Sequence, residues 1–320
     1  MRIETPSGHA PSRRLVAISI GAIVVVWALN FIAAKIGLRH LPPLTMASFR
    51  IVIAGVVMLP IYLICRRLPI FQEAARASRS GFTGRDLWTF LYLGFFGVAI
   101  NQSCFTIGLH YSSVTHSAVI VGIGPIYTLA LAVLFRVEKA TWRKASGMAI
   151  AFVGIALLAS ENGLSAHSPS LFGDGITMTG SLGFAMYAVL GKRVANKYDT
   201  LTMSAFNHFA GALLMLPLAI REARAMGPAA HWRAIPWESW ASTLYMAVFG
   251  GAVALTLYFW LLRYLEASQL SAFTYLLPIT GTILGILWLG EKGSWEQVFG
   301  GSLALAGVYW VESGRPSETA

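Results

Sequence analysis

Charged side chains are scarce in this 320-residue chain: Asp, Glu, Lys and Arg together make up 12% of it, whereas apolar residues make up 56%. A water-soluble domain carries about 25% charged residues, so the composition excludes that class and indicates an integral membrane protein with many spans. The formal net charge is +10. Because the Lys and Arg residues lie in short segments between apolar runs, they follow the positive-inside rule and do not indicate a nucleic-acid partner.

Cysteine is also scarce, and motifs for catalysis or metal binding are missing from the sequence. The two cysteines, Cys65 and Cys104, fall in or beside apolar runs without metal or redox spacing, so we interpret them as packing residues. We find no H-E-x-x-H, no G-x-S-x-G and no cluster of Asp, His or Cys that could hold a metal or a nucleophile. An enzyme within the membrane is therefore only a distant alternative, and no cofactor or metal is expected.

Acidic side chains are absent from the interior of the apolar runs. A proton relay built on carboxylates is therefore not expected. His116 and His208 are the groups inside or at the edge of an apolar run that titrate near neutral pH. Each is interpreted first as a histidine satisfied within the core.

Ten apolar runs are present, each near the ~20 residues that cross ~30 Å of hydrocarbon. The first is too long for the hydrophobic region of a cleaved signal peptide, which spans about 7–15 residues, so we expect it to stay as a span. With ten spans both termini share a side, and placing them in the cytoplasm puts most Lys and Arg residues there. The runs lie at about 15–38, 43–65, 87–110, 113–135, 141–160, 172–195, 200–220, 238–263, 268–290 and 294–312.

The apolar runs form two copies of one pattern. Pro125 is followed after thirteen residues by Glu138, and Pro278 at the same distance by Glu291. Further pairs at the same offset of 153 residues are Thr141 and Ser294, Trp142 and Trp295, Gly147 and Gly300, and Gly154 and Gly307. Earlier matches, such as Lys35 with Lys192, are offset by 157, so the halves differ by four residues in a loop.

Each copy contains five apolar runs, and an odd number of spans inverts the second copy in the membrane. Inverted repeats suit a protein that opens alternately to either side around a central site. The predicted fold is an all-α integral membrane protein with ten transmembrane helices as two inverted five-helix repeats. Its predicted parts are a cytoplasmic tail at 1–14, a first repeat at 15–160, a linker at 161–171, a second repeat at 172–312 and a tail at 313–320.

The motifs resemble a known family of transporters. The pattern of Trp27, Asn30, Lys35, Arg50, Asn101-Gln102, Pro125, Glu138, Gly147 and Gly154, with its second copy, is similar to the EamA family of the drug/metabolite transporter superfamily. The resemblance covers roughly residues 15–312. It implies a transporter of the bacterial inner membrane with ten helices in an inverted repeat, commonly an exporter of amino acids or related metabolites. The implied partners are a small-molecule substrate and the lipid bilayer, in a monomer or homodimer.

Polar residues found in only one half are the better candidates for contact with a solute. Asn101 and Gln102 lie deep in the third run, where the second half has Ala254 and Leu255. An amide in hydrocarbon needs a partner, so both should face the protein interior. Neighbours on a helix point about 100° apart, so we expect only one of them to line a cavity. For Asn101, contact with a solute and an interhelical bond are both open.

The first and sixth runs present aromatic and polar residues at equivalent places, since Trp27 matches Phe184 and Asn30 matches Tyr187. This pairing suits a cavity for a moderately apolar solute, and core packing is the alternative for each aromatic residue. The candidate substrate-binding residues are Trp27, Asn30, Arg50, Asn101, Gln102, His116, Tyr187, Tyr258 and Tyr275.

Three basic residues are candidates for attracting an anionic group of the substrate. Arg50 lies about seven residues into the second run, where a charge is costly, and its counterpart is the neutral Asn207. Lys35 and Lys192 lie near the ends of the first and sixth runs. They either extend to the membrane interface or act as charges at the two mouths of the pathway.

Pro125 and Pro278 are candidate hinges, because a proline within a helix removes a hydrogen bond and permits a bend. A static kink is the alternative. Glu138 and Glu291 are expected to organise the turns that follow, through the N-terminal amides of the next helix.

The leading function is a secondary transporter that exports small amphipathic metabolites, with amino acids first, by alternating access around a central cavity. Efflux of cationic or aromatic drugs is the alternative. A site for cation efflux usually needs a carboxylate within the membrane, whereas the charges buried here are basic. A scaffolding membrane protein would not need inverted halves.

Overall fold

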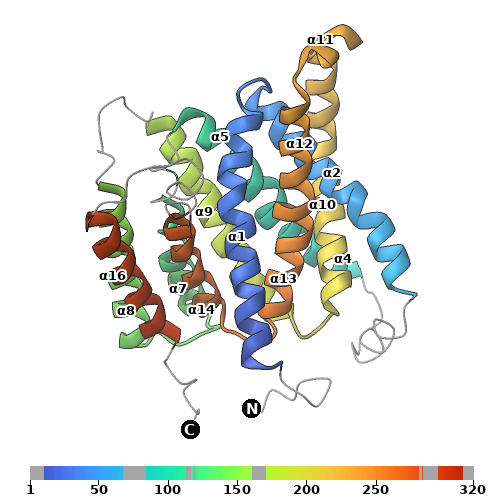
Figure 1. Cartoon of the computed structure of the whole chain (residues 1–320). Coiled ribbons are helices and arrows are strands. Elements are labelled where there is room, and N and C mark those ends of the chain that lie inside the picture. The colour runs from blue at the N-terminus through green and yellow to red at the C-terminus, as the bar shows by residue number, and fades with distance from the viewer. Residues whose placement is uncertain are drawn as a thin grey trace.

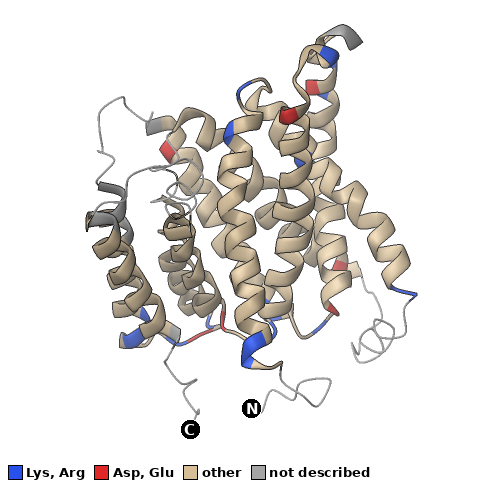
Figure 2. Ribbon diagram, in the orientation of Figure 1, with Lys and Arg blue, Asp and Glu red and all other residues tan. Residues whose placement is uncertain are grey.

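The computed structural model describes residues 11–67, 84–112, 117, 120–160, 171–280, 283 and 295–312. Within these ranges all regular secondary structure is helical, which confirms the predicted all-α class. Helix α1 (Arg13–Gly37) starts at the same end of the bundle at which α16 (Trp295–Glu312) finishes (Figure 1). Lys, Arg, Asp and Glu concentrate toward the two ends of the bundle, and its middle is almost free of them (Figure 2).

Five helical segments of the described residues are long and apolar enough to cross a membrane. They are α1, α2 (Pro43–Cys65), Gly84–Tyr111, α10 (Thr200–Ala225) and Trp237–Leu261. The other large helices are α7 (Gly124–Leu134), α8 (Trp142–Ser160), α9 (Leu171–Val194) and α16. A short helix, α11 (Ala229–Ala234), lies between α10 and Trp237. The helical membrane architecture is thus present, whereas the count of ten spans stays a prediction.

Two of the long segments change helix type at equivalent positions. In the first half, α4 (Gly84–Leu93) leads into a π-helix, η1 (Gly94–Ile100), and then into α5 (Asn101–Tyr111). In the second half, α12 (Trp237–Tyr245) leads into the π-helix η2 (Met246–Val253) and α13 (Ala254–Leu261). The repeat offset of 153 residues places η1 on 247–253, within η2. A π-turn shifts the phase of the helix that follows and is frequent at functional sites.

The helical breaks near the two prolines also correspond. Helix α7 begins at Gly124 after a turn at 122–123, with Pro125 in its first turn. In the second half, α14 (Ala267–Ala272) changes to a 3₁₀ turn, η3 (Phe273–Tyr275), shortly before Pro278. Pro125 therefore starts a helix after a break, where its missing N–H costs nothing, and does not bend a continuous helix as predicted. The hinge role of both prolines stays a prediction.

Lys35 and Lys192 make equivalent bonds in the two halves. The Nζ of Lys35 donates to the carbonyl oxygens of Leu109 (3.0 Å) and Ser112 (3.2 Å). The Nζ of Lys192 donates to those of Leu262 (2.7 Å) and Leu265 (2.7 Å), which are the repeat counterparts. Each ammonium thus satisfies carbonyls at a helix C-terminus and opposes the negative end of its dipole. The structure gives both lysines a capping role, and their role as mouth charges stays a prediction.

Helices α8 and α16 pack against each other through small residues. A Cβ atom added to Gly154 would lie 2.4 Å from the backbone N of Ala304 and 2.6 Å from the O of Gly300. One added to Gly307 would lie 2.6 Å from the O of Gly147. The repeated glycines therefore allow two backbones to touch, which is how helices in lipid gain packing energy.

Several polar contacts join the halves at the end of the bundle where α1 begins, and two of them involve a buried carboxylate. Glu138 accepts hydrogen bonds from the backbone N of Ser268 in α14 (3.2 Å) and from Lys144 Nζ (3.0 Å). Lys144 also pairs with Glu266 at 2.6 Å. Glu138 does organise its own turn through Lys144, but the helix amide that it binds belongs to the second half and not to the next helix. Glu291 lies outside the described residues.

The second contact involves Asp86, which is fully buried at the start of α4. Its carboxylate accepts hydrogen bonds from the hydroxyl of Tyr198 and from Lys197 Nζ, both in the turn before α10. The hydrogen bond to Asp86 raises the pKa of Lys197. Both inter-half contacts therefore hold this end of the bundle together in the observed conformation.

The α8–α16 contact can be tested by adding bulk at Gly154. Gly154→Val should destabilise the protein, because the neighbouring backbone of α16 cannot move aside as a flexible side chain could; overpacking costs about 1–3 kcal/mol. We expect the melting temperature in detergent to fall by roughly 5 °C. Gly21→Val is the matched control, because no atom lies within 4 Å of a Cβ at this exposed helical glycine. Equal melting temperatures for the two variants would contradict the packing described.

Candidate functional site

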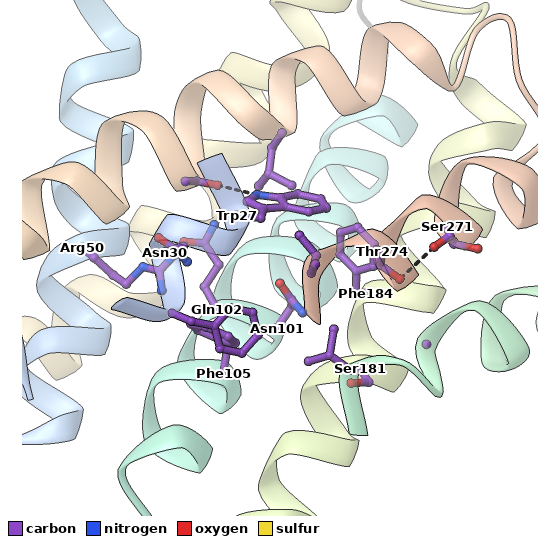
Figure 3. Close-up of a pocket in the computed structure, with 16 residues that line it drawn as sticks. Trp27, Asn30, Arg50, Asn101, Gln102, Phe105, Ser181, Phe184, Ser271 and Thr274 are labelled. Carbon is purple, nitrogen blue, oxygen red and sulfur yellow. Dashed lines mark hydrogen bonds between the residues drawn. The ribbon is translucent and has the colours of Figure 1, made fainter. Parts of the chain in front are cut away.

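A cavity of about 90 Å³ lies between helices of both halves. A cavity of this size holds several waters or a small solute. Aromatic residues form much of its wall: Trp27, Phe31, Phe105 and Phe184. The polar residues that line it are Asn30, Arg50, Asn101, Gln102, Ser181, Ser271 and Thr274 (Figure 3). Of the predicted substrate-binding residues, the structure brings five to this cavity, namely Trp27, Asn30, Arg50, Asn101 and Gln102.

Arg50 is a buried cation in this cavity, with 2% of its surface exposed. Its Nη1 donates to the hydroxyl of Thr106 at 3.2 Å, and the guanidinium carbon lies 6.0 Å from the centre of the Phe105 ring. Its Nε has no hydrogen-bond partner among the described residues. No Asp or Glu lines the cavity within the described part of the chain. A buried charge that lacks a paired counter-ion is costly, so the site is suited to receive an anion.

Unpaired amide atoms lie beside this cation. Both polar atoms of the Gln102 side chain and the Oδ1 of Asn30 are buried and have no hydrogen-bond partner among the described residues. Nearly all buried polar groups in proteins are hydrogen-bonded. Exceptions that line one cavity together with Arg50 indicate a place for a polar ligand or for water.

Asn101 and Gln102 both line the cavity. The prediction that only one of them would do so is wrong, because the cavity reaches two sides of α5: Asn101 points toward α9, and Gln102 lies toward Arg50 (Figure 3). The Nδ2 of Asn101 donates to the carbonyl of Gly180 in α9 at 3.0 Å. Asn101 therefore makes an interhelical bond and also lines the cavity.

Trp27 is fixed in the wall by one hydrogen bond and one ring contact. Its Nε1 donates to the carbonyl of Gly250 in the π-helix η2 at 3.1 Å. Its ring meets that of Phe184 edge to face, with centroids 5.5 Å apart and planes at 82°. Gly250 allows the helix backbone to approach Asn30 closely, because a Cβ at this position would lie 2.4 Å from the Oδ1 of Asn30. The π-helix thus brings bare backbone against the polar side of the cavity.

The remaining aromatic candidates pack in the core, outside the main cavity. Tyr187, Tyr258 and Tyr275 are each at most 1% exposed. Tyr187 and Tyr258 stack with ring centroids 6.4 Å apart, and the Tyr275 hydroxyl donates to the carbonyl of Met148 at 3.3 Å. Tyr258 does line a much smaller neighbouring cavity. In this conformation the three tyrosines therefore occupy core-packing positions, which was the stated alternative to lining the cavity.

The two histidines do not belong to this cavity either. His208 is buried in α10, and its Nδ1 lies 2.7 Å from the carbonyl oxygen of Ser204. It is not among the lining residues. His116 lies outside the described residues.

Among the lining residues that sequence reasoning missed are Phe105 and three hydroxyl side chains, those of Ser181, Ser271 and Thr274. Ser181 lies one helical turn before Phe184, and so on the same side of α9. Thr274 precedes Pro278 by four residues and is thus the position whose carbonyl loses its helical donor. That spacing is the signal that could have found it.

Comparison with known proteins places the chain among transporters. A family model described as "EamA-like transporter family" matches residues 15–160 and 171–313. An "Uncharacterized transporter" of Archaeoglobus fulgidus is 25% identical over 92% of this chain and 97% of its own length. A "Probable terminal-alkyne amino-acid exporter" of Streptantibioticus cattleyicolor is 24% identical over 90% of each chain. The "Uncharacterized inner membrane transporter YedA" of Escherichia coli is 25% identical over 84% of this chain and 81% of its own.

A solved structure shares the fold. A crystal structure matches with a TM-score of 0.72 over 94% of this chain and 99% of the other, at 15% sequence identity. At that identity the likeness concerns the fold alone.

The contact between Gly250 and Asn30 gives a test of the cavity wall. Gly250→Ala should displace the Asn30 amide, because the added methyl group would overlap its oxygen; since this amide is the end of a side chain beside a cavity, we expect the lower end of the about 1–3 kcal/mol that overpacking costs. The adjacent Gly251→Ala is the matched control, since its nearest atom would lie at an ordinary 3.5 Å. We expect a lower melting temperature for Gly250→Ala than for Gly251→Ala in detergent. A Gly250→Ala protein as stable as the control would show that the wall is looser than described.

Proposed function

The chain belongs to the EamA-like transporter family, and on that premise we propose that it is a secondary transporter that exports small amphipathic metabolites, amino acids and related compounds first. The observation that carries this proposal is the cation of Arg50 in the cavity, without a carboxylate among the described lining residues. A cation in such a site attracts an anionic group such as a carboxylate. The aromatic residues around it favour an apolar portion on the same molecule.

The amino-acid class has independent support from one relative. The protein of Streptantibioticus cattleyicolor is named a probable terminal-alkyne amino-acid exporter, and a molecule of that class has both a carboxylate and an apolar part. The aromatic wall also suits aromatic drugs, which keeps the alternative function open. Cationic drugs fit less well, because the charge in the cavity is itself positive.

Transport is proposed to occur by alternating access in a bundle of ten spans, with repeats at 15–160 and 172–312 and a linker at 161–171. The equivalent π-helices, helix breaks and lysine caps support two halves of common design. In an inverted repeat, each half can adopt the conformation of the other, which opens the opposite side. Pro125 and Pro278 lie beside the breaks at which such a change would bend the chain.

The inter-half contacts define what must separate when the transporter changes state. Glu138 with Ser268 and Asp86 with Lys197 each join the first half to the second at one end of the bundle. We assign this end to the cytoplasm of a bacterium with the protein in its inner membrane, because the predicted topology puts both termini there. Opening toward the cytoplasm therefore requires that these bonds break.

Arg50→Gln tests the charge-reading role. The variant keeps a long polar side chain but removes the charge, and losing a charged hydrogen bond worth about 1.5–3 kcal/mol should lower amino-acid export by roughly tenfold or more. The measurement is efflux of a labelled amino acid from preloaded cells that overexpress the protein. Arg39→Gln is the matched control, because Arg39 is exposed at the end of α1.

Three results are possible. Loss of amino-acid export with Arg50→Gln alone would support the proposal. Export that is unchanged in both variants would exclude a role for Arg50 in binding the substrate carboxylate. Efflux of cationic dyes without efflux of amino acids would favour the alternative function.

The topology can be tested at residue 168, which lies in the predicted external linker and outside the described residues. With Cys65 and Cys104 replaced by alanine, a single cysteine introduced as Ser168→Cys should react with a membrane-impermeant maleimide added to intact spheroplasts. Labelling that appears only after the membrane is permeabilised would invert the proposed orientation.

A further inference from the structure

The two ends of the cavity differ in the kind of hydrogen-bonding group that they present. Arg50, Asn30 and Gln102 lie at one end, which we call the basic end (Figure 3). Ser271 and Thr274 lie at the opposite end, with Trp27 and Phe184 between (Figure 3). We call the end formed by Ser271 and Thr274 the acceptor end, for the reasons that follow.

The hydroxyl hydrogens at the acceptor end are already engaged. Ser271 donates its hydroxyl hydrogen to the carbonyl of Ser268 at 3.0 Å, and Thr274 donates its own to the carbonyl of Ser271 at 2.8 Å. A hydroxyl has one hydrogen and two lone pairs. With the hydrogens directed to the backbone, both side chains can offer only acceptor lone pairs to the cavity.

The backbone adds to the same chemistry. Pro278 has no N–H, so the carbonyl of Thr274 cannot accept the α-helical bond from that position. Pro125 has the same effect on the carbonyl of Val121, and Val121 is also a lining residue of the cavity. Discontinuous helices in membranes use such carbonyls to bind ligands. In both halves, the proline at the helix break therefore favours a backbone hydrogen-bond acceptor over a donor near the cavity.

The unpaired donors of the described cavity wall, on Arg50 and Gln102, lie at the basic end, away from these acceptors (Figure 3). Among the described lining residues Arg50 is the single cation, and it lies at the basic end. Between the two ends, Asn101 uses one Nδ2 hydrogen for the carbonyl of Gly180, which leaves its second Nδ2 hydrogen as a donor and its Oδ1 as an acceptor. A donor on the ligand can form hydrogen bonds with these neutral acceptors, and such bonds stabilise the bound state. The acceptor end is therefore complementary to a hydrogen-bond donor on the solute.

We propose that the solute is an amino acid whose side chain ends in a hydrogen-bond donor, held with that donor at Ser271 and Thr274. The amino and carboxylate groups of an α-amino acid share one carbon, so both stay near Arg50, Gln102 and the Oδ1 of Asn101. The methylene chain then passes between Trp27 and Phe184, and its terminal hydroxyl or ammonium reaches the acceptor end. This inference rests on the proposed function and specifies its substrate class.

The test uses three probes of equal chain length with different ends: norleucine (methyl), 6-hydroxynorleucine (hydroxyl) and lysine (ammonium). The full-length protein is reconstituted in liposomes, and uptake of each labelled probe is measured by counterflow. We expect 6-hydroxynorleucine or lysine to be transported roughly tenfold better than norleucine, in line with one or two added hydrogen bonds. A preference for one of the two identifies the hydroxyl or the ammonium as the donor.

The double variant Ser271→Ala/Thr274→Val should abolish this preference. Its matched control is Ser242→Ala/Thr243→Val, which removes two buried hydroxyls that donate to the Ser239 carbonyl at 2.9 and 2.8 Å, outside the cavity. Melting temperatures of both double variants show whether each protein is folded. A preference that survives in the folded Ser271→Ala/Thr274→Val protein would overturn the inference.

The outcomes separate this inference from the proposed function. Equal transport of the three probes, with all of it lost in Arg50→Gln, would overturn the acceptor end and leave the amino-acid exporter in place. If the wild-type protein transports none of the three probes but does transport a cationic dye, the proposed function itself fails.

Discussion

The structure depends on one constraint: hydrocarbon offers no hydrogen bonds, so each polar group inside it needs a partner from the protein or from a ligand. Lys35 and Lys192 meet this demand at two helix ends, where their ammonium groups bind carbonyls that the helices leave unpaired. In the cavity several polar groups are left without partners among the described residues. Arg50 lacks a counter-ion, and the Gln102 amide lacks partners among the described residues. Binding of a solute would supply what the fold leaves out.

The two halves share one backbone arrangement, but the side chains at equivalent positions differ in chemistry. Gly250 in η2 lies against Asn30, whereas its counterpart Gly97 in η1 lies against the ring of Tyr187, the counterpart of Asn30. The same close approach of a π-helix thus holds an amide in one half and a buried phenol in the other. The first half supplies the charge and the amides, and the second half supplies Ser271 and Thr274. In the function that we propose, a solute between them would contact both halves, and this would couple binding to their relative movement.

Much of the architecture could be predicted from the sequence, because the features that repeat are backbone features. The prolines, the glycines of α8 and α16 and the paired lysines recur at fixed offsets, and the structure gives each pair an equivalent place. The π-helices could not be predicted, since no local signal distinguishes Gly94–Ile100 from an ordinary apolar helix. The argument that only one of Asn101 and Gln102 would line the cavity failed for another reason: the width of a cavity between distant helices cannot be derived from the phase of one helix. Tyr187, Tyr258 and Tyr275 point to a different limit: whether an aromatic residue lines a cavity or packs beside it depends on neighbours from distant segments.

The central claim is that Arg50 binds the carboxylate of the solute. A thermodynamic cycle that combines one substitution in the protein with one change in the ligand tests it most directly. The affinities of purified wild-type protein and Arg50→Gln would be measured for an amino acid and for its amide, which has no negative charge. If the two interact, the affinity advantage of the acid over the amide should be large for wild type and absent for the variant, with a coupling of about 1.5–3 kcal/mol. An equal advantage in both proteins would mean that the carboxylate lies elsewhere, and the account of the site would be wrong.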